Sequence, residues 1–363
     1  MTADNATGQP WLQQETLYAS GDGRYHTYRI PALAVSSLGT VLAFAEGRKH
    51  GRGDAGEIDL VLRRSFDNGR TWTPVQLVVT ESGMTCGNPC PVVDRNTGTI
   101  WLPFCKNLAD GDESMICEGK APRTVWTTHS VDDGQTWSEP RDITASVKDP
   151  QWTWYATGPC HGIQLDSGRL VVPCDHIVGL HFDRSRDPYH SHVIYSEDSG
   201  ATWQLGGDVD VGTNECAIAQ LQDGSLYINC RNYVGGTQRA VARSYDQGQT
   251  FAEFEWDETL IEPVCQGSIE SMPGGQLLFA NPASTRRERM TVRLSSDGGR
   301  TWPAAQTLHS GPSAYSDLAA LPDGNICCLY ENGEGQPYEK LTLALFNIAW
   351  LVTTQPQLAC NPE

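Results

Sequence analysis

Short apolar runs, each ended by a polar turn, follow one another along the whole chain. Runs such as TVLAFAEG (residues 40–47), SLYINCRN (225–232) and QLLFANP (276–282) have the length of β-strands, and Gly-containing pairs such as Asp223-Gly224 separate them. We find no stretch that sustains the 3.6-residue apolar period of an amphipathic helix. The pattern predicts an all-β protein built from hairpins.

A repeated motif, Ser-x-Asp-x-Gly-x-Thr-aromatic, punctuates these runs. Its five copies begin at Ser65, Ser130, Ser196, Ser244 and Ser295. They lie 48 to 66 residues apart, which suits one four-stranded antiparallel sheet per repeat, the unit of a β-propeller blade. We expect the Asp to accept backbone N–H bonds, the Gly to adopt a positive φ, and the aromatic ring to pack beneath the turn. The motif is therefore interpreted as structural, and not as a calcium site, because each loop offers too few oxygen ligands.

The spacing also predicts the number of blades. Dividing the 363 residues by the mean spacing gives about six. The sixth blade lacks the motif and is expected near the C-terminus, at residues 319–352, closed by N-terminal sequence. We therefore predict one domain, residues 1–363, folded as a six-bladed β-propeller with four-stranded antiparallel blades.

Charge and hydropathy limit the partners. The net charge of −18, from 26 basic and 44 acidic residues, disfavours nucleic acid and anionic membranes. No apolar run approaches the ~18 residues of a membrane span, and the first twenty residues do not resemble a signal peptide. We expect a cytoplasmic protein, or a secreted one if a leader has been removed. An anion site would have to be a local basic patch.

Neither the cysteines nor the histidines predict a metal site. Most of the twelve cysteines are expected to be reduced, buried thiols, and Cys86 and Cys90 in CGNPC do not have the spacing of a zinc pair. The histidine-rich stretch from His176 to His192, which includes His181 and His190, also fits no standard zinc pattern, and we interpret it as a polar rim loop. We expect no metal and no cofactor.

The segment YRIPAL (residues 28–33), followed by the five repeats, resembles the sialidase (neuraminidase) superfamily, whose marker is an Arg-Ile-Pro ahead of several such Asp boxes. The resemblance covers about residues 18 to 351. It implies a retaining exo-α-sialidase that removes terminal sialic acids from glycoconjugates through a sialyl-tyrosine intermediate. Loops from all blades meet at a propeller's axis, so the functional residues should be scattered along the sequence.

The resemblance implies three arginines that clamp the substrate carboxylate. They correspond to Arg29, Arg231 in NCRNY and, as the third, Arg287, with Arg286 and Arg289 as competitors. A guanidinium group can hold a carboxylate through two hydrogen bonds and stays charged at any working pH. Arg29 or Arg231 in isolation would be explained better by a surface or strand-edge salt bridge.

The implied nucleophile is Tyr315 in GPSAYSDL, with Glu215 in TNECAIAQL as its base. A phenol has a pKa near 10 and needs such a base, but it escapes the repulsion that a carboxylate nucleophile would meet from the substrate's own carboxylate. The acid/base corresponds to Asp54 in a glycine-rich loop expected to close over the substrate, with Asp59 and Glu57 as rivals. To donate a proton, Asp54 needs a raised pKa, which burial under the ligand would provide.

Further contacts follow from the same resemblance. Arg48 is expected to touch the substrate carboxylate, and Asn88 and Gln266 are expected to touch the sugar. Glu46 is expected to orient Arg29 by pairing with it.

Specificity is less constrained. Tyr155 is expected either to line the glycerol or leaving-group side or to pack, and Asp175 or His176 stands where some relatives carry two tyrosines. A trans-sialidase, a hydrolase of another nonulosonic acid such as Kdn, and a non-enzymatic binding propeller are the alternatives. The sequence leaves the linkage preference and the oligomeric state open.

Overall fold

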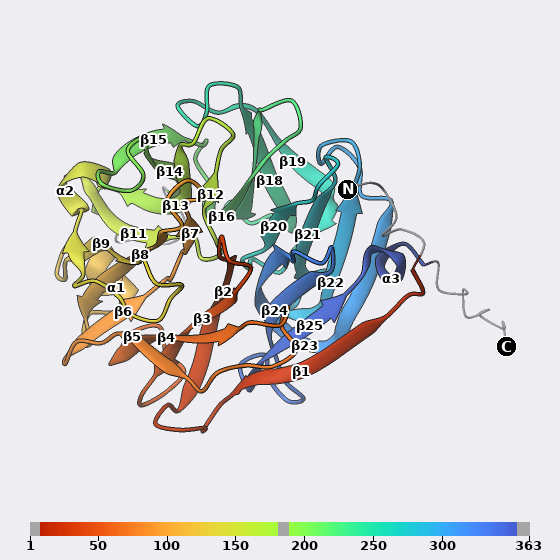
Figure 1. Ribbon diagram of the computed structural model, residues 1–363. Coiled ribbons are helices and arrows are strands. Elements are labelled where there is room, and N and C mark those ends of the chain that lie inside the picture. Colours follow the sequence, from red (N-terminus) through yellow and green to blue (C-terminus); the bar gives the residue numbers. More distant parts are fainter. Residues whose placement is uncertain (1–7, 181–188, 354–363) are drawn as a thin grey trace, which may run out of the picture.

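The computed structural model describes residues 8–180 and 189–353. Antiparallel strands dominate these ranges, and the three helices found in them, α1 (Glu113–Cys117), α2 (Thr144–Val147) and α3 (Ile348–Val352), are each a single short turn or little more. Figure 1 shows the sheets arranged around a common centre. The prediction of an all-β fold with four-stranded antiparallel units is confirmed.

The strands follow one another as antiparallel meanders. The first meander contains β2 (Thr27–Val35), β3 (Val41–Arg48), β4 (Ile58–Ser65) and β5 (Gln76–Val79). The second contains β6 (Met84–Gly87) and β7 (Val92–Val93), which both pair with β8 (Ile100–Leu108), followed by β9 (Arg123–Ser130) and β10 (Arg141–Asp142). The third meander contains β11 (Trp152–Thr157) and β12 (Ile163–Gln164), which both pair with β13 (Leu170–Val178), followed by β14 (Tyr189–Ser196) and β15 (Gln204–Asp208). The fourth contains β16 (Thr213–Gln220), β17 (Leu226–Asn232), β18 (Gln238–Ser244) and β19 (Ala252–Ile261).

The remaining strands are β20 (Ser268–Ser271), β21 (Leu277–Pro282), β22 (Glu288–Ser295), β23 (Ala304–Ala320), β24 (Ile326–Asn332), β25 (Lys340–Phe346) and β1 (Leu12–Ala19). The long strand β23 pairs with β22 through its first part and with β24 through its second, so it belongs to two meanders at once. A single parallel pair between β4 and β6 likewise connects the first two meanders. The hydrogen-bonded sheets are therefore fewer than the meanders.

The two ends of the described chain are joined in one sheet. Strand β1 pairs antiparallel with β25, from Leu12 opposite Phe346 to Ala19 opposite Lys340. In Figure 1 the red strand β1 runs beside the blue C-terminal strands. The prediction that N-terminal sequence closes the C-terminal sheet is confirmed.

The innermost strands contact one another in a closed ring. Strand β2 touches β7 and β23, β12 touches β7 and β16, and β20 touches β16 and β23. Buried apolar clusters fill the spaces between neighbouring sheets, for example one that joins Leu33 and Val61 to Leu329 and Leu343. A ring of this kind brings the first residues of many strands to one end of an axis.

The repeated motif forms the turn between the third and fourth strands of a meander. In the first copy the Ser65 hydroxyl accepts a bond from the Gly69 N–H (2.8 Å), and Asp67 accepts bonds from the N–H (2.8 Å) and hydroxyl (2.7 Å) of Thr71. Gly69 has a φ of 82°, and the Trp72 indole donates to its carbonyl oxygen (3.1 Å). The serine, aspartate and threonine bonds recur in the other four copies. The structural interpretation of the motif is confirmed.

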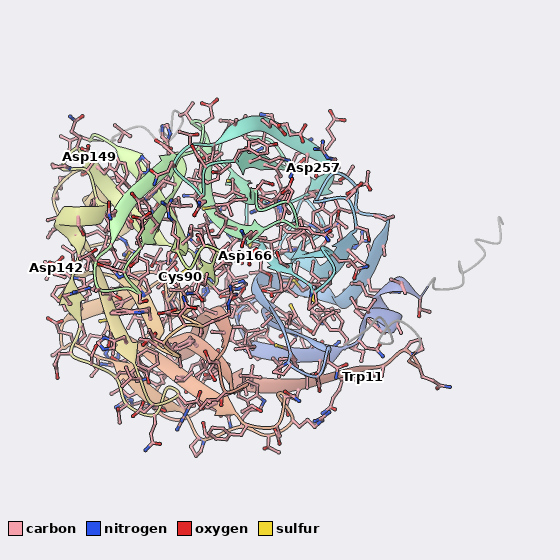
Figure 2. All side chains as sticks on the ribbon, turned by 45° about the horizontal axis from the view of Figure 1, so that its top comes forward. Trp11, Cys90, Asp142, Asp149, Asp166 and Asp257 are labelled. Carbon is pink, nitrogen blue, oxygen red and sulfur yellow. The ribbon has the colours of Figure 1, made fainter. Side chains whose placement is uncertain are left out.

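The thiols and the surface charges are segregated. All eleven cysteines in the described ranges are free and buried, which confirms the expected burial for these positions. In Figure 2 the labelled Cys90 lies toward the interior, while Asp142 and Asp149 lie at the periphery. No helix of the described residues is long and apolar enough to cross a membrane.

Candidate active site

A cavity of about 410 Å³ opens at the end of the ring where the inner strands begin. Its lining comes from segments scattered between residues 29 and 338. Six arginines of the described chain take part, namely Arg29, Arg48, Arg52, Arg123, Arg231 and Arg287. This is a local basic patch in an acidic protein, and three of its acidic members, Glu46, Asp54 and Glu215, pair with these arginines.

A tyrosine, a glutamate and an arginine meet at the wall of this cavity. The Tyr315 hydroxyl donates to Oε1 of Glu215 at 2.6 Å, and Nη1 of Arg231 donates to the other carboxylate oxygen of Glu215 at 2.6 Å. The same Nη1 lies 3.2 Å from the Tyr315 oxygen. Tyr315 starts the inner part of β23, Glu215 lies near the start of β16 and Arg231 near the end of β17, so the ring brings these three residues together.

The environment of Tyr315 keeps its phenol protonated. Burial raises the pKa of Tyr315 well above its usual value, and the negative charge of Glu215 raises it further, although Arg231 and Arg287 oppose this. The phenol therefore needs to lose its proton as it reacts. Glu215 already accepts the hydrogen bond from that proton, so the arrangement suits a base-assisted nucleophile.

Arg29 is held by Glu331, which the sequence analysis did not identify. Nε and Nη2 of Arg29 donate to the two carboxylate oxygens of Glu331 at 3.0 and 3.4 Å. Glu331 also accepts the backbone N–H groups of Ile30 (3.0 Å) and Tyr315 (3.2 Å), so one carboxylate positions both the arginine and the tyrosine. The only sequence signal for it is a lone acidic residue near the end of an otherwise apolar, buried strand.

The expected pairing of Glu46 with Arg29 is wrong. Oε2 of Glu46 accepts from Nε (2.9 Å) and Nη2 (2.6 Å) of Arg48, and Oε1 accepts the backbone N–H of Asn88 (2.8 Å). Arg29 lies directly opposite Glu46 in the pairing of β2 with β3, but the Glu46 carboxylate is taken by Arg48, which lies two residues away on the same face of β3. Arg29 pairs with Glu331. Asn88 lines the cavity and accepts a hydrogen bond from Arg123.

Asp54 lies across two arginines in the cavity mouth. Its Oδ1 accepts from Nη1 of Arg29 at 2.9 Å and from Nη1 of Arg48 at 2.8 Å, while 76% of the side chain stays exposed. Desolvation raises the pKa of Asp54, but the charges of Arg48 and Arg29 outweigh it and lower the pKa to about 2. The rivals Glu57 and Asp59 do not line the cavity. Asp59 is buried elsewhere, where it accepts hydrogen bonds from the hydroxyl groups of Tyr25 and Thr80.

Among Arg286, Arg287 and Arg289, the candidates for the third arginine of the clamp, Arg287 is the one that lines the cavity. Its Nη1 donates to the Tyr338 hydroxyl at 2.7 Å, and its guanidinium carbon lies 5.6 Å from the centre of the Tyr315 ring. Arg286 is 80% exposed and pairs with Glu288 at the surface. Arg289 is also exposed and does not line the cavity. Tyr338, which the sequence analysis missed, lines the cavity beside Arg29.

The expected sugar contact of Gln266 is not seen. Gln266 is buried and does not line the cavity. Its amide nitrogen donates to the carbonyl oxygens of Pro159 and Ser316, both at 2.9 Å, and its amide oxygen accepts the Ser316 N–H at 3.0 Å. Because its amide is bound to backbone next to Tyr315, Gln266 supports the strand and leaves no donor for a sugar.

On β11 the cavity residue is Trp154, and Tyr155 packs in the core. Tyr155 is fully buried in the apolar cluster with Val125 and Val172. The Trp154 indole lines the cavity and donates to Oδ1 of Asp175 at 3.0 Å. Of the two open choices for Tyr155, the structure selects packing.

Asp175 forms part of the cavity wall, whereas His176 points away from it. Asn214 also donates to Oδ1 of Asp175 at 3.0 Å, but Oδ2 is buried without a hydrogen-bond partner. Burial and the charge of Glu215 raise the pKa of Asp175 well above its usual value. A neutral carboxyl group at this position can act as a hydrogen-bond donor toward the cavity.

The prediction of a histidine-rich rim loop is wrong for the described histidines. His176 lies on β13, and His190 and His192 lie on β14, so regular antiparallel pairing continues through them. His181 lies outside the described residues.

A larger and more open crevice of about 820 Å³ lies beside α1, β9 and α2, lined by residues such as Ile116, Ile143 and Trp152. Lys148 in this crevice already donates to the carbonyl oxygens of Arg123 (2.7 Å) and Thr153 (2.8 Å). Acid–base catalysis needs titratable groups within hydrogen-bond reach of one another. The smaller cavity offers such groups around Tyr315, so it is the candidate active site.

Several known proteins resemble the chain in sequence and fold. Residues 39–328 match the family described as the BNR repeat-like domain. The chain is 35% identical to a sialidase of Micromonospora viridifaciens over 98% of this chain and 57% of that protein, and 34% identical to sialidase-3 of Bos taurus over 93% of this chain and 92% of that protein. The chain thus spans little more than half the length of the bacterial relative. The solved structure of a Hadza microbial sialidase superposes with a TM-score of 0.84 at 30% identity, covering 93% of this chain and 69% of that chain.

Proposed function

The chain belongs to the sialidase family, and from that premise we propose that it is a retaining exo-α-sialidase that hydrolyses terminal sialic acids of glycoconjugates through a covalent sialyl-tyrosine intermediate. One observation carries the proposal: the 2.6 Å hydrogen bond from the Tyr315 hydroxyl to Glu215 inside an arginine-lined cavity. A propeller that only binds partners would not require a buried phenol and its carboxylate acceptor among several arginines of one cavity.

The arginines account for substrate binding. Arg29 and Arg287 lie over the Tyr315 ring, and Arg231 contacts its hydroxyl group. These three arginines hold the carboxylate of the sialic acid through charge-assisted hydrogen bonds. Glu331 holds Arg29 in place through two hydrogen bonds, and Glu215 holds Arg231 in place through one. Binding therefore needs little rearrangement of these arginines.

The first half-reaction forms the bond between the Tyr315 oxygen and the anomeric carbon while the bond to the aglycone oxygen breaks. The phenol proton passes to Glu215, and Asp54 donates its proton to the departing aglycone oxygen. The arginines stay in place and stabilise the charge of the oxocarbenium-like transition state.

Asp54 has to change partners before it can act as an acid. In the free protein its pKa is held near 2 by the arginines that it covers. The substrate carboxylate competes for the same Arg29 and displaces Asp54 toward the aglycone. Asp54 then loses a cationic neighbour and some of its water, and both changes raise its pKa.

In the second half-reaction a water molecule gives its proton to Asp54 and attacks the anomeric carbon as the bond to Tyr315 breaks. Glu215 returns its proton to the phenolate. Two inversions at one carbon leave the product with the configuration of the substrate, so the first-formed sugar is the α-anomer.

We also propose that residues 1–363 form one catalytic domain with six blades. The support for six is that the inner strands β2, β7, β12, β16, β20 and the second part of β23 follow one another around the ring. Each of them belongs to a different meander.

The experiment that tests the function combines product analysis with trapping. Proton NMR of sialyllactose hydrolysis should show the α-anomer first, and a fluorinated sialic acid should leave a mass adduct on the peptide that contains Tyr315. Initial formation of the β-anomer, or an adduct on another residue, would overturn the mechanism. Addition of a lactose acceptor distinguishes hydrolysis from sialyl transfer.

A further inference from the structure

Three histidines and an aspartate gather on one face of the sheet formed by β13, β14 and β15. His176 on β13 lies directly opposite His190 on β14, and His192 on β14 lies opposite Asp208 on β15. Directly opposed residues share a face of a sheet, and so do residues two apart on one strand. Three neighbouring strands therefore present four potential metal ligands or ligand supports to the same side.

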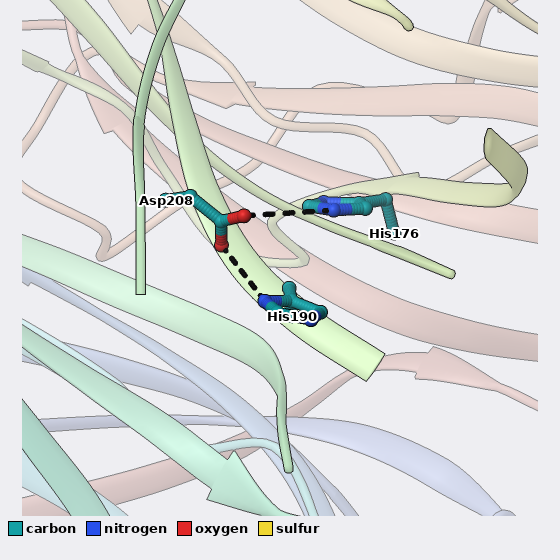
Figure 3. Close-up of side chains that lie close together, drawn as sticks. All are labelled: His176, His190 and Asp208. Carbon is teal, nitrogen blue, oxygen red and sulfur yellow. Dashed lines mark hydrogen bonds and ion pairs between the residues drawn. The ribbon is translucent and has the colours of Figure 1, made fainter. Parts of the chain in front are cut away.

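The side chains approach one another closely. Nδ1 of His190 lies 3.2 Å from Oδ1 of Asp208, and Nε2 of His176 lies 3.9 Å from Oδ2 of the same carboxylate, as Figure 3 shows. One ligand atom from each of these three residues can be chosen such that all lie within 4.8 Å of one another. None of the three residues lines the active-site cavity.

His176 carries an unexplained buried nitrogen. Its side chain has no exposed surface, and its Nε2 has no hydrogen-bond partner although it is aimed at the Asp208 carboxylate. An orphaned buried nitrogen costs free energy unless a ligand or a water satisfies it. This observation points to a missing group between His176 and Asp208.

The other nitrogen of His176 helps to define what that group is. Nδ1 of His176 and Nδ1 of His192 lie 3.0 Å apart, so one of them donates a proton and the other accepts it. When His176 is the donor, its Nε2 carries a lone pair directed at a carboxylate, and a cation placed between them makes the arrangement favourable. A ligand histidine that donates its second N–H to a neighbouring group is the usual arrangement at protein metal sites.

The His176 ring is also fixed by stacking. The Trp152 ring lies 3.4 Å from it, centroid to centroid, at an interplanar angle of 13°. His190 stacks on the opposite side at 5.3 Å and 14°. The ring therefore presents Nε2 in one direction, as a preorganised ligand would.

We propose that His176, His190 and Asp208 bind a divalent transition metal of the zinc class, with His192 as the group that orients His176. Two imidazoles and one carboxylate favour zinc or a neighbouring transition metal over calcium or magnesium, which require mainly oxygen ligands. Half of the Asp208 side chain is exposed (49%), so water can complete a tetrahedral coordination.

The ligand atoms of His176, His190 and Asp208 have to move slightly closer together to bind one metal ion. Bonds of about 2.0–2.1 Å in a tetrahedral site place ligand atoms about 3.3 Å apart. The contact between His190 and Asp208 already has this length. Asp208 is the last residue of β15 and His190 the second of β14, so both can turn toward the fixed His176 without distortion of a strand interior. Nδ1 of His190 also lies 3.1 Å from the carbonyl oxygen of Val209, so the metal takes the place of a proton there.

The metal would act on the fold of the cavity wall. It would connect β13, β14 and β15, and the residue before His176 on β13 is Asp175, whose carboxyl group faces the cavity. Because the metal binds the folded chain in preference to the unfolded chain, we expect it to stabilise this wall against unfolding.

The test uses the full-length chain, without a histidine tag, after removal of metals by a chelator. Addition of Co²⁺ should produce the visible absorption of a tetrahedral complex at one equivalent, and titration calorimetry with Zn²⁺ should give one site per chain. Asp208→Ala and His190→Ala should each weaken Zn²⁺ binding at least about tenfold. His309→Ala is the matched control, because His309 is half-buried outside the cluster and should bind Zn²⁺ as the unaltered chain does.

His176 is not varied, because it is fully buried and its loss would impair folding. The metal-free melting temperatures of the two variants show whether they fold, and the rise in melting temperature on addition of Zn²⁺ should be present in the unaltered chain and absent from both. His190→Gln replaces His190→Ala if the latter does not fold. Failure of the unaltered chain to bind a stoichiometric metal ion, or unchanged affinity in the Asp208 and His190 variants, would overturn the proposal.

Discussion

Asp54 occupies the mouth of the cavity by an ion pair with Arg29, with 2.9 Å between Oδ1 and Nη1. The carboxylate of this side chain thus lies where we expect the carboxylate of the substrate to bind. In the proposed mechanism, the general acid Asp54 and the substrate compete for Arg29. Substrate binding would then activate Asp54, and this proposed coupling leads to the first prediction.

Asp54→Ala should separate binding from proton donation. We expect kcat on sialyllactose to fall by about 10²- to 10⁴-fold, the usual contribution of a general acid or base. An activated aryl sialoside, whose leaving group needs no proton, should lose less. A carboxylate-bearing transition-state analogue should bind as well as before or better, because its competitor is gone. An unchanged kcat on sialyllactose would show that Asp54 is not the acid.

Tyr315→Phe removes the nucleophilic oxygen and keeps the ring. We expect kcat to fall by three or more orders of magnitude, as for loss of a covalent nucleophile, even on an activated aryl sialoside. The ring stays packed against Ile30 and Ala314, so the melting temperature should change little. Full activity of this variant would remove the proposed mechanism. Glu215→Gln should show a similar loss, because the phenol then has no base.

Arg287 and Arg286 form a matched pair for the third arginine of the clamp. Arg287 lines the cavity, whereas Arg286 is exposed and pairs with Glu288. Loss of a charge-assisted hydrogen bond costs roughly 1.5–3 kcal/mol, which corresponds to a rise in KM of about 10- to 150-fold for Arg287→Ala. Arg286→Ala should leave KM within about twofold. Equal effects of the two substitutions would mean that the clamp does not include Arg287.

The fold was predictable because its signal is local. In each Asp box the serine, aspartate, glycine and threonine bond to one another within eight residues, so the motif defines its turn whatever surrounds it. Tyr315 and Glu215 could also be identified from the sequence, because each lies in a segment that resembles the family. Their 2.6 Å contact could not be predicted, because it depends on the closed ring of strands.

The missed features depend on pairing between distant segments. Arg29 and Glu331 lie 302 residues apart in the sequence, so a nearer acid, Glu46, was chosen in its place. Trp154 was missed and Tyr155 was left open because β11 carries a register shift between Trp152 and Tyr155, and such a bulge changes which residues face each side. The histidine cluster likewise arises from the register of three strands, which spacing along the chain does not reveal.

The last prediction concerns the stability of the axis away from the cavity, where His161 bridges two carboxylates. Its Nδ1 lies 2.9 Å from Oδ1 of Asp317, and its Nε2 lies 3.1 Å from Oε2 of Glu270. Burial lowers the pKa of His161, but the two carboxylates outweigh it and raise the pKa well above 6.5. A histidine with a raised pKa in the folded state stabilises the fold fully below its unfolded pKa, and this contribution disappears as the pH rises through the folded pKa.

His161→Gln should therefore cost more free energy of unfolding at pH 6 than at pH 9, measured by urea denaturation at both values. His129→Gln is the control, because burial and Arg141 lower the pKa of His129, and no carboxylate contributes to that shift. A charged His161 between the buried carboxylate of Asp317 and the partly exposed carboxylate of Glu270 is the physical cause of the expected difference, since glutamine can donate a hydrogen bond but cannot carry the charge. A cost that is equal at the two pH values, or larger at pH 9, would show that His161 is neutral in the folded protein and that the two carboxylates do not retain its proton.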